Sequence, residues 1–139
     1  MKEILFGAAY YLEYMPYDRL KEDLDMMQQA GMNTIRIAES TWSTLEPTDG
    51  EFDFSYIDRV LEEAQKRKMN VIIGTPTYAI PSWLEKKCPE VMVYNKEGRA
   101  RYGHRQIMDI AYVVAHCFIK HFRPLCIWLK EGERCDLKL

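Results

Sequence analysis

The sequence has few of the features that place a protein in a specialised class. No apolar run reaches the ~20 residues that cross a membrane. The amino-terminal stretch MKEILFGAAYYLEY is too acidic, and its apolar part too short, for a signal peptide. Positive and negative side chains nearly balance, with a net charge of -2, so neither nucleic acid nor a membrane is expected as a partner. These absences predict a cytoplasmic protein.

Cysteine pairing is also missing, since the four cysteines form no CxxC pair. The spacing of Cys117, Cys126 and Cys135 with His116 and His121 matches no usual zinc-ligand pattern. A chain that is 47% apolar does not need disulfides to hold a core together. Reduced thiols in or near a core are therefore favoured over a zinc site, and neither a metal nor a cofactor is expected.

The chain does contain the elements of one parallel α/β domain. With 139 residues it is about one domain long. Strands are predicted at Ile4–Ala9, Thr34–Ile37 and Val71–Ile73, and each is a continuous apolar run of the kind buried on both faces of a sheet. Helical spacing of apolar residues follows the first two strands, and a short helix is predicted between Pro81 and Pro89.

Particular residues support the two longer helices. Gly31 is expected to end the first helix, and Ser55 to cap the second. The apolar stripes predicted to face the core are Leu20, Leu24 and Met27 in the first helix, and Ile57, Val60, Leu61 and Ala64 in the second.

This β-α-β-α-β order is compatible with an open doubly wound sheet or with part of a (β/α)8 barrel. No glycine-rich phosphate-binding turn follows the first strand, as a dinucleotide fold would require. Instead, aromatic and polar residues follow all three strands, and in a barrel these loops meet at the face that holds the active site. The barrel is therefore preferred. The loop residues are Tyr10, Tyr11 and Glu13, then Glu39 and Trp42, then Thr75, Thr77 and Tyr78.

Glu39 and Trp42 are the candidate binding residues of the second loop. An aromatic ring beside a carboxylate suits a sugar, which has an apolar C–H face and a rim of hydroxyls. The residue types allow a second interpretation equally well, in which Trp42 covers the end of the barrel and Glu46-Pro47 only forms a turn.

Two long blocks of the sequence resemble the amino-terminal part of glycoside hydrolase family 42, the bacterial β-galactosidases. The first is GAAYYLEYMPYDRLKEDLDMMQQAGMNTIRIAESTWSTLEPTDGEFDFSYIDRVL, which is similar to the family's first two strand–helix units. The second is IIGTPTYAIPSWLEKKCPEVMVYNKEGRARYGHRQ, which is similar to the third strand and its loop. The resemblance covers Ile4 to about Ile110. It implies the first three units of a TIM barrel and a galactoside substrate.

The resemblance also suggests roles for individual residues. Arg105, in the motif GHR, matches a substrate-binding arginine of the family, and a planar guanidinium suits adjacent sugar oxygens. Without the resemblance, a surface arginine would be the simpler interpretation. Glu39 and Trp42 are assigned to the same substrate-binding pocket. Arg36 is expected either to brace the carboxylates or to form a buried structural ion pair.

Two departures from the family pattern are visible. Leu12 replaces the proline of the Tyr-Tyr-Pro-Glu sequence that many relatives have after the first strand. Asp109 occupies the position of a zinc-binding cysteine in some relatives, so the resemblance does not support a zinc site of that type.

The catalytic residues of the family have no counterpart in this sequence. Retaining glycosidases use two carboxylates, and in this family the acid/base glutamate follows an asparagine. Here Asn33, Asn70 and Asn95 are followed by Thr, Val and Lys. The prediction is an amino-terminal barrel portion over residues 1–110 that is inactive alone, with an atypical tail over 111–139 from a frameshift or early stop. The alternatives are a carbohydrate-binding fragment without chemistry, and an assembly fragment that associates through open sheet edges.

Overall fold

The computed structural model describes residues 4–74, 76, 79–92, 94–96 and 98–99. Its main elements, in chain order, are β1 (Gly7–Ala9), α1 (Leu20–Gln29), β2 (Thr34–Ile37), α2 (Trp42–Leu45), α3 (Ser55–Lys66), β3 (Asn70–Ile73), α4 (Ser82–Lys87), β4 (Tyr94–Asn95) and β5 (Gly98–Arg99). Two short 3-10 turns, Leu12–Tyr14 and Pro89–Val91, complete the list. Each helix within the described residues is too short or too polar to cross a bilayer.

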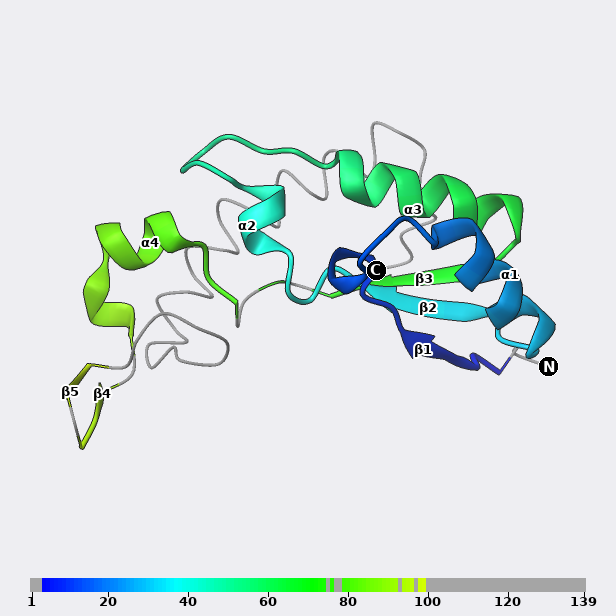
Figure 1. Ribbon diagram of the computed structural model, residues 1–139, viewed down its shortest axis with the longest axis horizontal. Helices are drawn as coiled ribbons and strands as arrows, with labels where there is room; N and C mark the ends of the chain where they lie inside the picture. Colours follow the sequence, from blue (N-terminus) through cyan, green and yellow to red (C-terminus); the bar gives the residue numbers. More distant parts are fainter. Residues whose placement is uncertain (1–3, 75, 77–78, 93, 97, 100–139) are drawn as a thin grey trace.

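The first three strands form a parallel sheet in the order β1-β2-β3 (Figure 1). Gly7 pairs with Thr34, and Thr34 pairs in turn with Asn70. A Cβ added at Gly7 would lie 1.7 Å from the Thr34 carbonyl oxygen, so a glycine is needed where the two strands approach. This arrangement confirms the predicted parallel α/β order.

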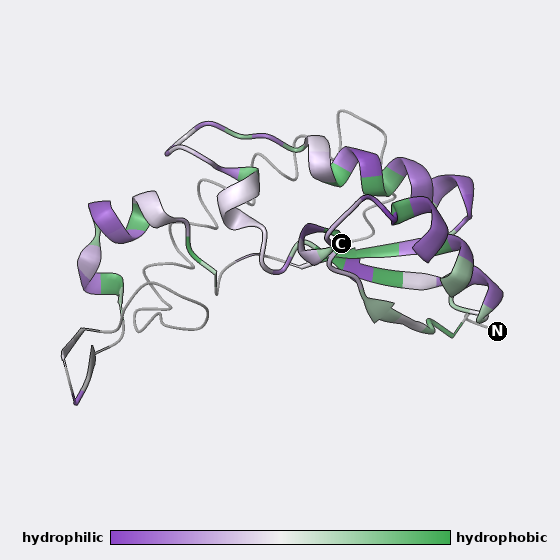
Figure 2. Ribbon diagram, viewed as in Figure 1, coloured by the Kyte–Doolittle hydropathy of each residue, from purple (hydrophilic) through white to green (hydrophobic). Residues whose placement is uncertain are grey.

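Helices α1 and α3 cover one face of this sheet (Figure 1). Ile35 and Ile37 of β2 point into that layer and are fully buried. Apolar side chains of the helices meet them: Leu20, Leu24, Ile57, Val60 and Ala64 are buried in the same cluster, with Met27 and Leu61 partly buried against it. In Figure 2 both helices alternate between apolar green and polar purple, as expected when one side of a helix packs and the other faces water.

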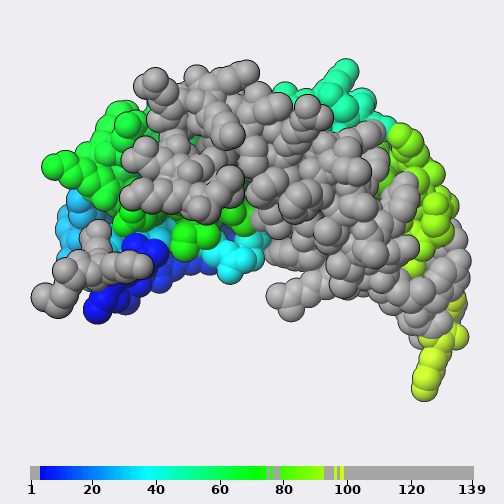
Figure 3. Space-filling model, turned by 180° about the vertical axis from the view of Figure 1, so that it is seen from behind, coloured from blue at the N-terminus to red at the C-terminus, as the bar shows by residue number. Residues whose placement is uncertain are grey.

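The opposite face of the sheet is open, which corrects the prediction of strands buried on both sides. All three residues of β1 are exposed, and the amino-terminal strand reaches the surface in Figure 3. On β3, Ile72 keeps 46% of its surface exposed. Among the described residues, one layer of helices packs on the sheet, and β1 and β3 each have a neighbouring strand on one side only. The predicted strand at Ile4–Ala9 is also shorter than expected, since its first three apolar residues precede β1.

A second apolar cluster lies beyond the sheet, around α2 and α4. Trp42 packs there with Ile80, Leu84, Cys88, Val91 and Met92. The predicted helix in this region is present, and α2 is a further short helix that the sequence did not reveal. Figure 1 shows α2 and α4 extending away from the carboxyl ends of the strands.

The two helix-end predictions have different outcomes. Gly31 follows α1 with a positive φ of 80°, as expected of a glycine that ends a helix. At the start of α3, however, Ser55 makes no side-chain cap. Asp53 accepts a hydrogen bond from the Ser55 backbone N–H at 2.9 Å instead, so the carboxylate two residues earlier binds a free N–H at the start of this helix.

Candidate functional site

The chain leaves β2 through an unusual backbone conformation at Ala38. Its φ is 73°, in the left-handed region that non-glycine residues seldom adopt. The side chain is fully buried, and the Thr41 hydroxyl donates a hydrogen bond to the Ala38 carbonyl oxygen at 2.9 Å. Such conformations cost on the order of 1–3 kcal/mol and persist only where the surroundings enforce them. The result is a sharp turn that sets Glu39 at the carboxyl end of the sheet.

Glu39 is held at this position by a side chain of β2, a tyrosine of the loop after β1 and a glycine directly after β3. Its carboxylate lies 2.6 Å from Nη2 of Arg36 and accepts a hydrogen bond from the Tyr11 hydroxyl at 3.2 Å. A Cβ added at Gly74 would lie 2.4 Å from Cγ of Glu39, so the end of β3 leaves room for this side chain. Residues in or directly after three neighbouring strands therefore converge on one carboxylate.

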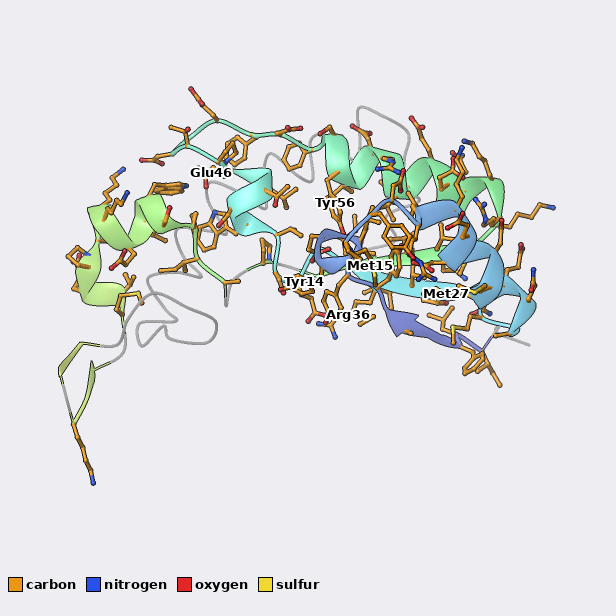
Figure 4. All side chains as sticks on the ribbon, viewed as in Figure 1. Tyr14, Met15, Met27, Arg36, Glu46 and Tyr56 are labelled. Carbon is orange, nitrogen blue, oxygen red and sulfur yellow. The ribbon has the colours of Figure 1, made fainter. Side chains whose placement is uncertain are left out.

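The ion pair between Arg36 and Glu39 decides between the two interpretations of Arg36. The Arg36 side chain is 52% exposed, whereas that of Glu39 is 19% exposed. A buried structural pair is therefore wrong, and Arg36 braces Glu39 from the open face of the sheet. Figure 4 shows Arg36 at the end of the strands.

Trp42 and Glu46 lie deeper than the sequence suggested. Both are fully buried. The Trp42 indole N–H donates to one Glu46 carboxylate oxygen at 2.8 Å, and the backbone N–H of Gly50 donates to the other at 2.7 Å. The Trp83 indole N–H reaches the Glu46 carbonyl oxygen at 2.9 Å. Glu46 therefore joins the second-strand loop to α4, which is more than the plain turn that the alternative interpretation assumed.

A tyrosine that sequence analysis did not single out joins the first-strand loop to α3. The Tyr56 hydroxyl donates to a Glu13 carboxylate oxygen at 2.8 Å, and the other Glu13 oxygen is buried with no hydrogen-bond partner in the described part of the chain. Burial, followed by the Glu13 hydrogen bond, raises the pKa of Tyr56 above its usual value. The sequence carries no signal for this contact, because the position of Glu13 depends on the conformation of the first-strand loop.

Tyr10 makes a comparable contact with α1. It is buried, and its hydroxyl lies 3.1 Å from a carboxylate oxygen of Asp23. Burial and then this hydrogen bond raise the pKa of Tyr10. Of the two tyrosines after β1, Tyr10 thus points into the helix layer while Tyr11 points to Glu39.

Several candidate residues lie outside the described part of the chain: Arg105, Thr75, Thr77, Tyr78, Asp109, and the tail residues His116, Cys117, His121, Cys126 and Cys135. Of the predicted binding residues, the structure places Glu39 in the cluster at the ends of the strands and Trp42 in the neighbouring apolar core. Within the residues that are described, no three His, Cys, Asp or Glu side chains come together as metal ligands.

Comparison with known proteins identifies the family. The sequence profile of the glycoside hydrolase family 42 β-galactosidases matches residues 9–121. The chain belongs to this family. The match runs past residue 110, where the resembling blocks end, so family similarity continues into the segment that the sequence had assigned to an atypical tail.

Similar proteins and structures agree with this assignment. A β-galactosidase of Thermus thermophilus is 36% identical over 103 residues, covering 73% of this chain and 16% of the relative. The β-galactosidase structure of Marinomonas ef1 is 35% identical with a TM-score of 0.66, covering 75% of this chain and 16% of that one. For the enzyme of the haloarchaeon Halorubrum lacusprofundi, the identity is 29%, the TM-score 0.71, and the coverage 84% and 18%.

These likenesses establish the architecture of this family 42 chain as part of a TIM barrel. The three parallel strands correspond to a portion of the barrels of these glycosidases. The chain spans about 16% of the length of the curated relatives it matches. It therefore accounts for a small part of such an enzyme.

Proposed function

We propose that this chain supplies the first three strand–helix units of a retaining β-galactosidase barrel that acts on terminal β-galactosides. The observation that carries the proposal is the convergence of Tyr11, Arg36 and Gly74 on Glu39 at the carboxyl ends of three parallel strands. In a TIM barrel this is the end where substrate binds. The family membership supplies the substrate class.

The proposed substrate-binding residues are Glu39, Trp42 and Arg105. Glu39 presents a partly exposed carboxylate that accepts hydrogen bonds. Trp42 is fully buried, so its proposed part is to position the second-strand loop through its indole bond to Glu46. Arg105 is assigned by its match to the family motif alone.

We further propose that the 139 residues have no hydrolytic activity by themselves. The sequence holds no Asn-Glu pair for the acid/base, and a full barrel takes about 250 residues. Glu46 is a poor substitute because both its carboxylate oxygens accept hydrogen bonds in a fully buried position. Residues 1–110 are proposed as the barrel portion. Because the family match continues to residue 121, the proposed tail of different character, predicted over 111–139, is expected to depart from the family only after that residue.

The test is hydrolysis of a chromogenic β-galactoside by the purified chain, expressed in a host without β-galactosidase. No turnover above the rate of buffer is expected. Turnover that persists through purification and disappears in a Glu39→Gln variant would contradict the proposal, because it would make Glu39 a catalytic group.

A role in assembly is the second candidate, favoured by the open face of the sheet. The exposed residues of β1 and the exposed Ile72 of β3 leave apolar surface and two strand edges without partners among the described residues. Such edges favour pairing with another chain. Self-association, measured as native mass in solution, is the expected consequence.

A further inference from the structure

The segment that follows β1 carries an unusual group of exposed apolar side chains. Tyr14, Met15 and Tyr17 retain 57%, 39% and 62% of their surface, and all lie within four residues of the chain. Single exposed apolar residues are common on protein surfaces, so the neighbours of each of these side chains decide what it can bind.

One member of this group adjoins the Glu39 cluster. The Tyr14 ring lies 5.6 Å from the Tyr11 ring, centroid to centroid, with 35° between their planes. The Tyr11 hydroxyl in turn donates to Glu39, whose other carboxylate oxygen pairs with Arg36. Figure 4 shows Tyr14 and Arg36 near the same end of the strands. An exposed aromatic ring is thus linked, contact by contact, to a half-exposed guanidinium.

Tyr17 has a different environment, although it is equally exposed. The guanidinium carbon of Arg19 lies 5.7 Å from the centroid of its ring, in cation–π geometry. The Tyr17 ring therefore already has a cation on its face, and that cation pairs with Asp23 rather than with Glu39. This difference makes Tyr17 a matched control for Tyr14.

The combination at Tyr14 fits a sugar ring. An aromatic face receives the apolar C–H side of a pyranose, while a guanidinium donates to its hydroxyls and a carboxylate accepts from them. A purely apolar partner on the Tyr14 ring would make no hydrogen bonds with the Arg36–Glu39 pair. Arg36 and Glu39 are bonded to each other at 2.6 Å, so a guanidinium and a carboxylate lie side by side at this end of the strands.

We infer that Tyr14 is a stacking platform for a ring of the galactoside, with Arg36 and Glu39 bonding the hydroxyls at its edge. This inference rests on the proposed function, because it names how the same end of the barrel holds its substrate. It adds Tyr14 and Arg36 to the binding residues and assigns the 3-10 turn at Leu12–Tyr14 the task of presenting the ring.

The experiment is a ligand-observed NMR titration of the full chain with methyl β-galactoside, using mannitol as a polyol without a ring face. Tyr14→Ala is expected to weaken binding about five- to tenfold, as loss of an aromatic stacking contact does. Tyr14→Phe, which keeps the ring, and Tyr17→Ala are expected to stay within about twofold of the original chain. Circular dichroism of each variant verifies that the fold is retained.

The outcomes separate this inference from the proposed function. Equal binding by Tyr14→Ala and the original chain overturns the inference, and a simultaneous loss in Arg105→Ala would leave the proposed function standing. A loss in Tyr14→Ala with full binding by Arg105→Ala supports the inference and removes Arg105 from the proposed site. Absence of galactoside binding by the original chain, or equal binding of mannitol, overturns both.

Discussion

At the scale of single residues, Glu46 connects two parts of the molecule that are far apart in sequence. The indole N–H of Trp42 bonds its carboxylate and that of Trp83 bonds its carbonyl oxygen. The two contacts differ in burial: Trp42 is fully buried, while the second contact is partly buried. A buried acceptor that loses a donor keeps its desolvation cost, so the two tryptophans should contribute unequally to stability.

Replacement of each tryptophan by phenylalanine tests this difference. Trp42→Phe should lower the free energy of unfolding by about 1–3 kcal/mol, because a buried carboxylate oxygen loses this donor. Trp83→Phe should cost about 0.5–1.5 kcal/mol, the ordinary net value of a hydrogen bond. Urea unfolding followed by circular dichroism measures both. Equal losses would mean that indole volume, rather than the bond to the Glu46 carboxylate, stabilises this region.

At the scale of elements, α3 is tied to α1 through Arg67 just beyond its last turn. The guanidinium lies 2.7 Å from Glu63 of α3 and 2.6 Å from Asp25 of α1. Lys66 also lies 2.7 Å from Glu63. Hydrogen bonds from Lys66 and Arg67 lower the pKa of Glu63 from 4.5 to about 2. The carboxylate thus connects the cations at this end of the helix pair.

This lowered pKa predicts an acid-sensitive contribution to stability. Because the folded-state pKa is below the unfolded value, the contribution is complete above pH 4.5 and is lost as pH falls toward about 2. Glu63→Gln should therefore flatten the dependence of unfolding free energy on pH between those values, as followed by urea titrations at several pH values. Glu62→Gln, at the exposed neighbouring position, is the control and should leave the slope unchanged.

Element by element, the sequence predicted best the position of the central strand and the buried faces of the two long helices. Thr34–Ile37 was predicted with its observed bounds, and Leu24 and Val60 are buried as their spacing indicated. The predicted burial of β1 was wrong, because an apolar run does not reveal whether a sheet has one covered face or two. Trp42 was predicted to line a pocket because of its residue type. Its full burial depends on the left-handed turn at Ala38 and on contacts with α4, which the sequence does not reveal.

At the scale of the whole molecule, the described part of the chain covers one face of the sheet with a helix layer and leaves exposed residues on the other. Arg36 lies between Ala9 and Ile72 across the strands, and all three are exposed. From three strand–helix units the sequence indicated open sheet edges, but its apolar strands predicted a sheet covered on both faces. An apolar residue in such a position favours association with another surface.

Ile72→Lys should accordingly reduce self-association of the purified chain. Ile72 is 46% exposed on a strand at the sheet edge, so a lysine there reaches water and blunts the edge with a charge. The weight-average mass from sedimentation is expected to fall toward that of one chain. Met26→Lys, at a residue that is 51% exposed on α1, is the matched control, and an equal effect there would point to net charge as the cause.

The parallel register also sets an order of events during synthesis. Gly7 can pair only after Thr34 has been synthesised, 27 residues later. Thr34 in turn pairs with Asn70, a further 36 residues along the chain. Each pairing closes a long loop before it yields any hydrogen bond between strands, which slows folding. A chain emerging from the ribosome therefore completes the β1–α1–β2 unit first and adds β3 to the free side of β2 afterwards. A pause in translation between the second and third strands would give that unit time to form.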